Sequence, residues 1–328
     1  MIKIAASVEL PVGESLVIQK NRIEPVGGLS GKRPKRICVV TGTHGDELEG
    51  QYVAWRLSDA LNKHIKHLHG IVDIYPAINP LGINSINRGM PLSDLDLNRI
   101  FPGNANGPIA EYLASEALND MKGADACIDI HASNIFLREL PQIRINELMA
   151  EDLLPLARRM NMPLIWIHAS ATVLESTLAH SLNSLGTPTL VVEMGVGMRI
   201  TKEYGEQLVD GIFSLMSHLG IWSRKTPPTI PPIVSSDWQV AFINSNHSGI
   251  FISEVSHIST VQQGQRLGFI ADPLSGRVLE RINSPVTGLL FTLREYPVVY
   301  EGSLLARILH GDPGDPSEGS EPWMEANM

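Results

Sequence analysis

Short aliphatic runs alternate with segments of helical periodicity from about residue 36 to residue 220. The aliphatic runs have the length of buried strands, and the segments between them repeat apolar residues every three or four positions. This alternation is typical of βαβ units, so it predicts an α/β fold: a mostly parallel twisted sheet with helices on both faces. In such sheets ligands bind outside the carboxyl ends of the strands. The expected strands are "RICVVTG", "GIVDIYPAIN", "ACIDIHAS", "PLIWIHAS" and "TPTLVVEMG".

The pattern changes at "TPPTIPPIV", residues 226–234, where four of nine residues are proline. Such a segment is stiff and extended, so it predicts a linker between a first domain over residues 1–225 and a second over residues 235–310. Residues 1–35 are expected to form a β edge segment of the first domain. The second domain contains only short strands and turns, which predicts a small all-β fold. Residues 311–328 are polar and rich in Pro and Gly, so we expect them to be disordered.

Composition limits the partners. The chain has 328 residues with 26 basic and 35 acidic side chains, a net charge of −9 that argues against nucleic acid. The first residues lack the apolar core of a signal peptide, and no run reaches the roughly 18 apolar residues of a membrane span. We therefore expect a cytoplasmic protein with no membrane partner. Cys38 and Cys127 lie in apolar runs and are expected to be free core thiols.

Imidazoles and acids follow two of the expected strands. His44 and Glu47 lie in "TGTHGDELEG", and His131 lies in "DIHAS". Two imidazoles and one carboxylate are the ligands of a catalytic zinc site whose fourth position is left for water. Taken separately, His44 is better explained as a turn histidine hydrogen-bonded to backbone, and Glu47 as an acid that complements a helix dipole. The spacing of His44 and Glu47 is common and is by itself a weak signal for a metal site.

A long loop, residues 79–103, follows the second expected strand and contains Arg88, Asn98 and Arg99. Its end, "DLDLNRIFPG", alternates polar groups with Leu and Ile, which indicates a partly buried segment rather than a solvated one. Arginine binds carboxylates through two parallel hydrogen bonds, so the arginines of this loop suit a carboxylate ligand.

Four motifs in order, "GTHGDELEG", "NPLGINSINRG…DLDLNRIFPG", "DIHAS" and "VVEMG", resemble the succinylglutamate desuccinylase/aspartoacylase family of zinc carboxypeptidase-like hydrolases. The resemblance covers residues 36–220. It implies one Zn²⁺ per chain held by His44, Glu47 and His131, with Glu193 of "VVEMG" as the general base. It also implies that Asn98 and Arg99 hold a substrate carboxylate and that Arg88 polarises the scissile carbonyl. For Glu193, the alternative is a strand-end acid paired with a lysine.

The implied activity is hydrolysis of the amide bond of an N-acyl amino acid or a similar small carboxylate. Arg138 and Arg144 follow the third ligand, and they are candidates for binding a second substrate carboxylate or, alternatively, surface arginines. Two rival functions use the same fold: a zinc carboxypeptidase acting on short peptides, and an inactive binding protein. The sequence leaves a homo-oligomer open.

The second domain resembles a biotinyl/lipoyl-like barrel-sandwich. In carrier domains of that kind a lysine bears the cofactor, but residues 226–310 contain no lysine. This excludes a carrier role, and we expect the domain to cover the active site or to mediate oligomerisation.

Overall fold

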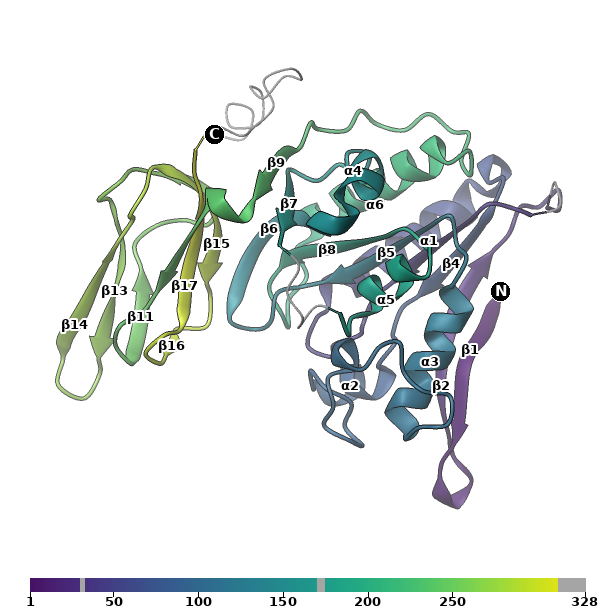
Figure 1. Cartoon of the computed structure of the whole chain (residues 1–328), viewed down its shortest axis with the longest axis horizontal. Helices are drawn as coiled ribbons and strands as arrows, with labels where there is room; N and C mark the ends of the chain where they lie inside the picture. The colour runs from purple at the N-terminus through teal and green to yellow at the C-terminus, as the bar shows by residue number, and fades with distance from the viewer. Residues whose placement is uncertain (30–32, 170–174, 312–328) are drawn as a thin grey trace.

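The computed structural model describes residues 1–29, 33–169 and 175–311 (Figure 1). Within these residues the strands form a 13-stranded mixed sheet and a 4-stranded antiparallel sheet. The main path of the large sheet is β1 (Ile2–Glu9), β2 (Ser15–Ile23), β4 (Ile71–Tyr75), β3 (Arg36–Val40), β5 (Ala126–His131), β8 (Thr189–Gly195), β6 (Leu137–Asn146), β15 (Gly288–Arg294), β17 (Leu304–Leu309) and β10 (Val240–Asn244). Off this path, β7 (Leu164–His168) pairs with β6 and β9 (Ile233–Ser236), and β12 (Ser259–Val261) pairs with β15.

The centre of the large sheet is parallel: β4, β3, β5 and β8 run in one direction. β6 joins β8 in the antiparallel sense, and β7 and β9 then continue parallel to β6. The predicted α/β fold is therefore confirmed, as a mixed sheet rather than a purely parallel one. The helices are α1 (Glu49–Lys63), α2 (Pro80–Ser85), α3 (Ile109–Met121), α4 (Ala150–Ala157), α5 (Leu178–Ser184) and α6 (Lys202–His218).

Helices cover both faces of this sheet, as the alternating pattern predicts. α1, α4 and α6 contribute to one hydrophobic cluster, and α3 and α5 contribute to a second one. Val53, Leu57 and Leu61 of α1 are fully buried at a spacing of four, and Leu113 and Ala117 repeat that spacing on α3. Each helix therefore buries one apolar stripe. Alternate residues of β3 enter the two clusters, so this strand lies between two helical layers.

The C-terminal β module, residues 240–309, is a two-sheet sandwich. β10, β12, β15 and β17 extend the large sheet, and the small sheet is formed by β14 (Arg277–Asn283), β13 (Arg266–Asp272), β11 (Gly249–Ser253) and β16 (Val298–Val299). Residues of both sheets form one core that includes Phe251, Leu267, Leu290 and Leu305. The prediction of a small all-β C-terminal region is confirmed, and the β6–β15 pairing joins it to the α/β sheet.

The N-terminal segment, the proline-rich linker, the C-terminal tail and the two cysteines can also be compared with what the sequence predicts. The segment 1–35 contains β1 and β2 at the sheet edge opposite the β module (Figure 1). The expected linker spans residues 226–234, but its last two residues, 233 and 234, already belong to β9, which pairs with β7. Of the expected disordered tail, residues 312–328 lie outside the described residues. Cys38 and Cys127 are free and buried, as predicted. Among the described residues, no helix has the length and apolar character needed to cross a membrane.

Candidate functional site

The carboxyl ends of β3, β5 and β8 bring three sequence motifs together. His131 is the last residue of β5 and is paired in register with Glu193 of β8. His44 and Glu47 lie in the turn that leads from β3 to α1. This turn packs tightly, because the amide of Gly45 donates to the carbonyl of Asn87, and a Cβ at residue 45 would collide with neighbouring backbone. The turn is therefore fixed at the edge where His131 ends its strand.

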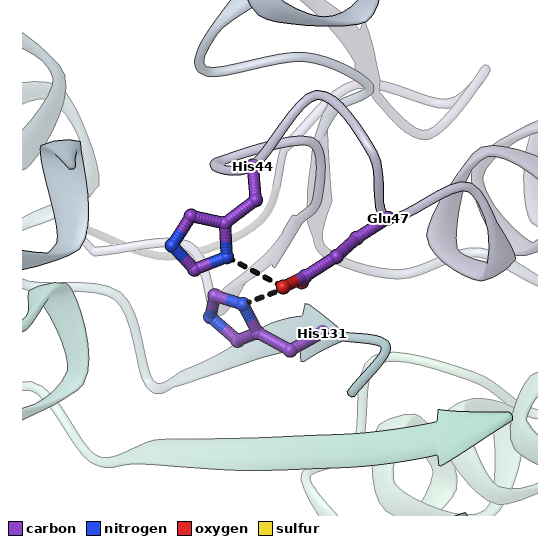
Figure 2. A group of neighbouring side chains, drawn as sticks. All are labelled: His44, Glu47 and His131. Carbon is purple, nitrogen blue, oxygen red and sulfur yellow. Dashed lines mark hydrogen bonds and ion pairs between the residues drawn. The ribbon is translucent and has the colours of Figure 1, made fainter. Parts of the chain in front are cut away.

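His44, Glu47 and His131 form one compact cluster (Figure 2). Nδ1 of His44 lies 2.7 Å from Glu47 Oε1, and Nδ1 of His131 lies 3.0 Å from Glu47 Oε2. One donor atom from each residue lies within 4.8 Å of the other two, and all three side chains are buried. Both imidazoles thus present the same ring nitrogen to a single carboxylate.

The opposite nitrogen of each imidazole contacts another acid. His44 Nε2 lies 2.9 Å from Asp96 Oδ1, and His131 Nε2 lies 3.2 Å from Asp129 Oδ2. A carboxylate stabilises a proton on Nε2, and the neutral imidazole then keeps its Nδ1 lone pair free. Carboxylates in this position are the usual partners of metal-binding histidines. The donor set therefore fits a divalent metal ion with two nitrogen ligands and one oxygen ligand.

The imidazoles of the cluster lower the pKa of two acids that contact them, Glu47 and Asp96. Burial raises the pKa of Glu47, but the imidazoles of His131 and His44 outweigh it and hold this pKa well below its usual range. Burial acts in the same way on Asp96, where the hydrogen bond with His44 dominates and lowers the pKa of the carboxyl. Both acids are therefore ionised at neutral pH, the form that a metal ligand requires. Burial lowers the pKa of His44 and of His131, but the neighbouring acids outweigh it and raise the pKa of both imidazoles, so a metal ion must displace a proton to bind them.

Glu193 differs from these acids. Its Oε1 lies 3.5 Å from Arg144 Nη1, and its buried Oε2 has no hydrogen-bond partner among the described residues. Burial raises the pKa of Glu193, and the charge of Arg144 opposes this shift. Its nearest cation is thus an arginine, not the lysine of the alternative interpretation. An acid that lies beside a candidate metal site, with a raised pKa and one oxygen unpartnered among the described residues, has the properties of a general base.

The 79–103 segment, expected to be a loop throughout, begins with the short helix α2 (Pro80–Ser85) and returns to the same place through a 3-10 helix, η3 (Leu97–Arg99). Asp96 caps this helix by accepting a hydrogen bond from the amide of Asn98 at 2.8 Å. The Asn98 side chain lies 3.5 Å from His131 Nε2, and Arg88 donates to Glu47 Oε1 at 2.9 Å. The expectation of a partly buried segment is confirmed, because Leu97 is 1% exposed.

A cavity of about 300 Å³ connects these groups. With the exception of Arg138, every residue predicted for the site lines it: His44, Glu47, Arg88, Asn98, Arg99, His131, Arg144 and Glu193. Arg138 instead pairs with Glu295 in the β module, at 3.1 Å. β6 has an irregular register between Glu139 and Gln142, where it faces β8. An extra residue reverses the faces on which later side chains lie, so Arg138 and Arg144 point to different sides.

Besides Asp96, which contacts His44, three residues of the site were not identified from the sequence. Asp129 supports His131 from two positions earlier on the same strand, a spacing that places both on one face and that gave a usable signal. Glu139 is fully buried beside Arg144, and Arg307 of β17 lines the cavity from the β module. Nothing in the local sequence marks these two, because their roles depend on pairing between distant strands.

The chain is similar in sequence to a known family and to a characterised enzyme. The model of the succinylglutamate desuccinylase/aspartoacylase catalytic domain matches residues 33–219. An N-alpha-acetyl-L-2,4-diaminobutyric acid deacetylase of Halomonas elongata is 26% identical over 242 residues, which cover 70% of this chain and 69% of the relative.

Solved structures share the fold over nearly the whole chain. The product-bound ectoine utilization protein EutE (DoeB) of Ruegeria pomeroyi has a TM-score of 0.77 at 18% identity, with 92% of each chain covered. A succinylglutamate desuccinylase of Silicibacter sp. TM1040 has a TM-score of 0.79 at 18% identity, over 94% of this chain and 95% of that one. The shared architecture includes the β module, since the coverage extends well beyond residue 219.

Proposed function

Because this chain belongs to the succinylglutamate desuccinylase/aspartoacylase family of amide hydrolases, we propose that it is a zinc-dependent deacylase of N-acyl amino acids or similar small carboxylates. One observation carries the proposal. Both imidazoles place Nδ1 next to a single carboxylate, and Glu193, whose Oε2 has no hydrogen-bond partner in the described part of the chain, lines the same cavity. The Halomonas elongata relative, which is named as a deacetylase of an N-acetylated amino acid, supports this substrate class.

In the proposed site, His44, Glu47 and His131 hold one Zn²⁺, and Asp96 and Asp129 keep the imidazoles in the binding tautomer. When bound, zinc lowers the pKa of water towards neutrality and polarises the amide carbonyl. Three ligands from the protein leave room for one further ligand, as in other catalytic zinc sites.

Glu193 is the proposed general base. It accepts a proton from the attacking water through Oε2 and returns it to the amide nitrogen as the C–N bond breaks, so the products are a carboxylate and a free amine. A step of this kind contributes roughly 10² to 10⁴ in rate. Arg144, 3.5 Å from Oε1, opposes the rise that burial causes in the pKa of Glu193.

The remaining cavity residues bind and polarise the substrate. Arg88 is the proposed donor to the oxygen that becomes negative in the tetrahedral intermediate, since its guanidinium already lies against Glu47. Asn98 and Arg99 are proposed to hold the carboxylate of the amino acid. Arg144 remains a candidate for a second substrate carboxylate. Arg138 is not included, because it pairs with Glu295 outside the cavity.

The cavity volume of about 300 Å³ favours a small substrate over a peptide that needs an extended groove. The test is a panel of N-acyl amino acids, with short peptides as the contrast set, assayed on the zinc-loaded protein. We expect turnover of at least one N-acyl amino acid and none of the peptides. Cleavage of peptides alone would support the carboxypeptidase alternative. If neither class of compound is hydrolysed, the result would support the alternative of an inactive binding protein.

Two variants separate metal binding from base chemistry. His44→Ala should lose both zinc and turnover, because it removes a ligand. Glu193→Gln should retain about one zinc per chain while turnover falls by roughly 10² or more, because the amide cannot accept the proton. His69→Ala, at an exposed histidine, is the matched control and should match the wild type. Normal turnover in Glu193→Gln would remove this residue from the mechanism.

A further inference from the structure

A row of side chains crosses the boundary between the α/β sheet and the β module. Glu139 of β6 is paired in register with Thr292 of β15, and Thr292 is paired with Arg307 of β17. Residues that lie opposite each other on neighbouring strands point to the same face of a sheet. The row therefore brings two residues of the β module to the acid that lies beside the catalytic cavity.

Glu139 is the centre of this row and has 0% exposed surface. Its Oε1 accepts hydrogen bonds from Arg307 at 2.7 Å and from Arg144 at 3.2 Å. Its Oε2 accepts from the hydroxyl of Thr292 at 2.5 Å and from Gln142 at 3.1 Å. A buried carboxylate is costly unless it is paired and fully hydrogen-bonded. The hydroxyl of Ser133 donates to Oε1 as well, at 3.2 Å. Two of these five donors, Arg307 and Thr292, come from the β module.

Arg144 connects this acid to the proposed base. Its Nη2 contacts Glu139 and its Nη1 lies 3.5 Å from Glu193 Oε1. The guanidinium also lies 5.4 Å from the ring centroid of Trp166, and Arg307 lies 5.5 Å from the same ring. Two cations thus share one carboxylate and one aromatic ring. Arg307 and Arg144 thus bind the same oxygen of Glu139, and Arg144 reaches from there to Glu193.

We propose that Arg307 is a positioning residue of the active site, through which the β module completes the catalytic cavity. Arg307 and Thr292 fix Glu139, Glu139 fixes Arg144, and Arg144 holds Oε1 of Glu193 so that Oε2 stays available to accept a proton. Arg307 acts through these groups rather than on the reacting atoms. The inference rests on the proposed role of Glu193 as the base.

The principal test is Arg307→Met, which removes the charge and keeps an apolar chain against Trp166. We expect kcat to fall by about tenfold or more with KM changed by less than about threefold, since a displaced catalytic group affects the chemical step. Arg307→Lys should restore most of kcat because it keeps the charge. Arg281→Met, at an exposed arginine of the same module, is the control and should match the wild type. An Arg307→Met enzyme with wild-type kcat would overturn the proposal.

A double-mutant cycle separates positioning from an independent effect. If Arg307 acts through Arg144, then Arg307→Met combined with Arg144→Met should be no slower than Arg144→Met alone. Losses that multiply in the double variant would contradict the relay. Zinc content and thermal unfolding are measured on each variant, so that loss of the fold is not mistaken for loss of position.

Two further arms cover the remaining outcomes. If Arg307→Met does not fold, Thr292→Val removes only the hydroxyl donor to Glu139 and should lower kcat several-fold; an unchanged kcat would overturn the proposal. If the wild-type protein hydrolyses no N-acyl amino acid, the proposed function fails. The contact chain Arg307–Glu139–Arg144 is then tested by thermal unfolding. The Tm shifts caused by Arg307→Met and Arg144→Met should not add in the double variant, because both arginines share Glu139. Additive shifts would refute it.

Discussion

Each imidazole of the candidate metal site has a carboxylate beside its Nε2, but the two contacts differ: His44 is hydrogen-bonded to Asp96, whereas the His131–Asp129 contact is an ion pair without hydrogen-bond geometry. Asp96, from a loop, contacts Nε2 of His44, and Asp129, from the same strand, contacts Nε2 of His131. In each case a carboxylate faces the nitrogen that points away from Glu47. This arrangement makes ligand orientation a property of residues that themselves need not touch the metal.

Asp129→Asn tests this orientation at the scale of one residue. The amide keeps the shape of the carboxyl but not its charge, so it stabilises the Nε2 proton of His131 less. We expect zinc affinity to fall by about 10- to 100-fold, the usual loss for such partners. Competition with a coloured chelator measures it. Asp94→Asn, at an exposed acid in the loop of Asp96, should leave the affinity unchanged. Equal affinities in both variants would exclude a role for Asp129 in orientation.

For single residues, the sequence allowed the candidate metal ligands to be identified, but it did not allow the contacts of the nearby arginines to be predicted. His44, Glu47 and His131 could be grouped because strand ends of a parallel sheet meet at one edge. Arg138 and Arg144 could not be separated, since both lie on the same short segment and carry the same charge. Only the irregular register of β6 against β8 distinguishes them.

Among the elements, the turn between β3 and α1 carries the tightest constraint. It presents His44 and Glu47, and it rests on the backbone of the 79–103 loop, where Gly45 donates to Asn87. That loop also provides Arg88, Asn98 and Arg99. The two segments therefore form one packed unit, and a change in the shape of either one displaces ligands and substrate-binding groups together.

Gly45→Ala tests the packing of this unit. The added Cβ would collide with the backbone of Gly82 and Asn87, so the turn must shift. We expect a loss of about 1–3 kcal/mol in the free energy of unfolding, typical of overpacking, together with weaker zinc binding. Chemical denaturation of the apoprotein and zinc competition measure the two effects. Gly27→Ala is the control, since a Cβ there meets no atom within 4 Å. Equal free energies of unfolding for the two variants would show that the turn accommodates the added Cβ without loss of stability.

For the whole molecule, the strand–helix alternation and the change of pattern near residue 226 allowed the α/β sheet and the β region to be predicted. The way the two join could not be predicted. Hydrophobic periodicity reports which face of a strand is buried, but it carries no information on which distant strand lies beside it. The β6–β15 pairing, and with it the place of Arg307 in the cavity, belongs to that missing information.

Removal of the β module should therefore affect the entire protein. A chain that ends at residue 236 would expose the edge of β6, leave Glu139 without Arg307 and Thr292, and uncover Leu140 and Trp166. We expect this chain to aggregate rather than fold as a smaller enzyme, because exposed strand edges and apolar patches promote association. Size-exclusion chromatography and circular dichroism measure the outcome. A monomeric truncated chain with normal kcat would show that the catalytic domain is independent.

The hydrogen bond between Glu139 and Arg307 joins residues 168 positions apart in the chain. During synthesis, all the proposed metal ligands and the proposed base leave the ribosome more than a hundred residues before Arg307 does. Until β17 emerges and pairs, Glu139 lacks one of its cationic partners, and the cavity lacks one of its walls. A nascent chain of this protein thus carries all the proposed ligands and the proposed base well before Arg307, and the cavity wall is completed only when β17, the last strand among the described residues, has been translated.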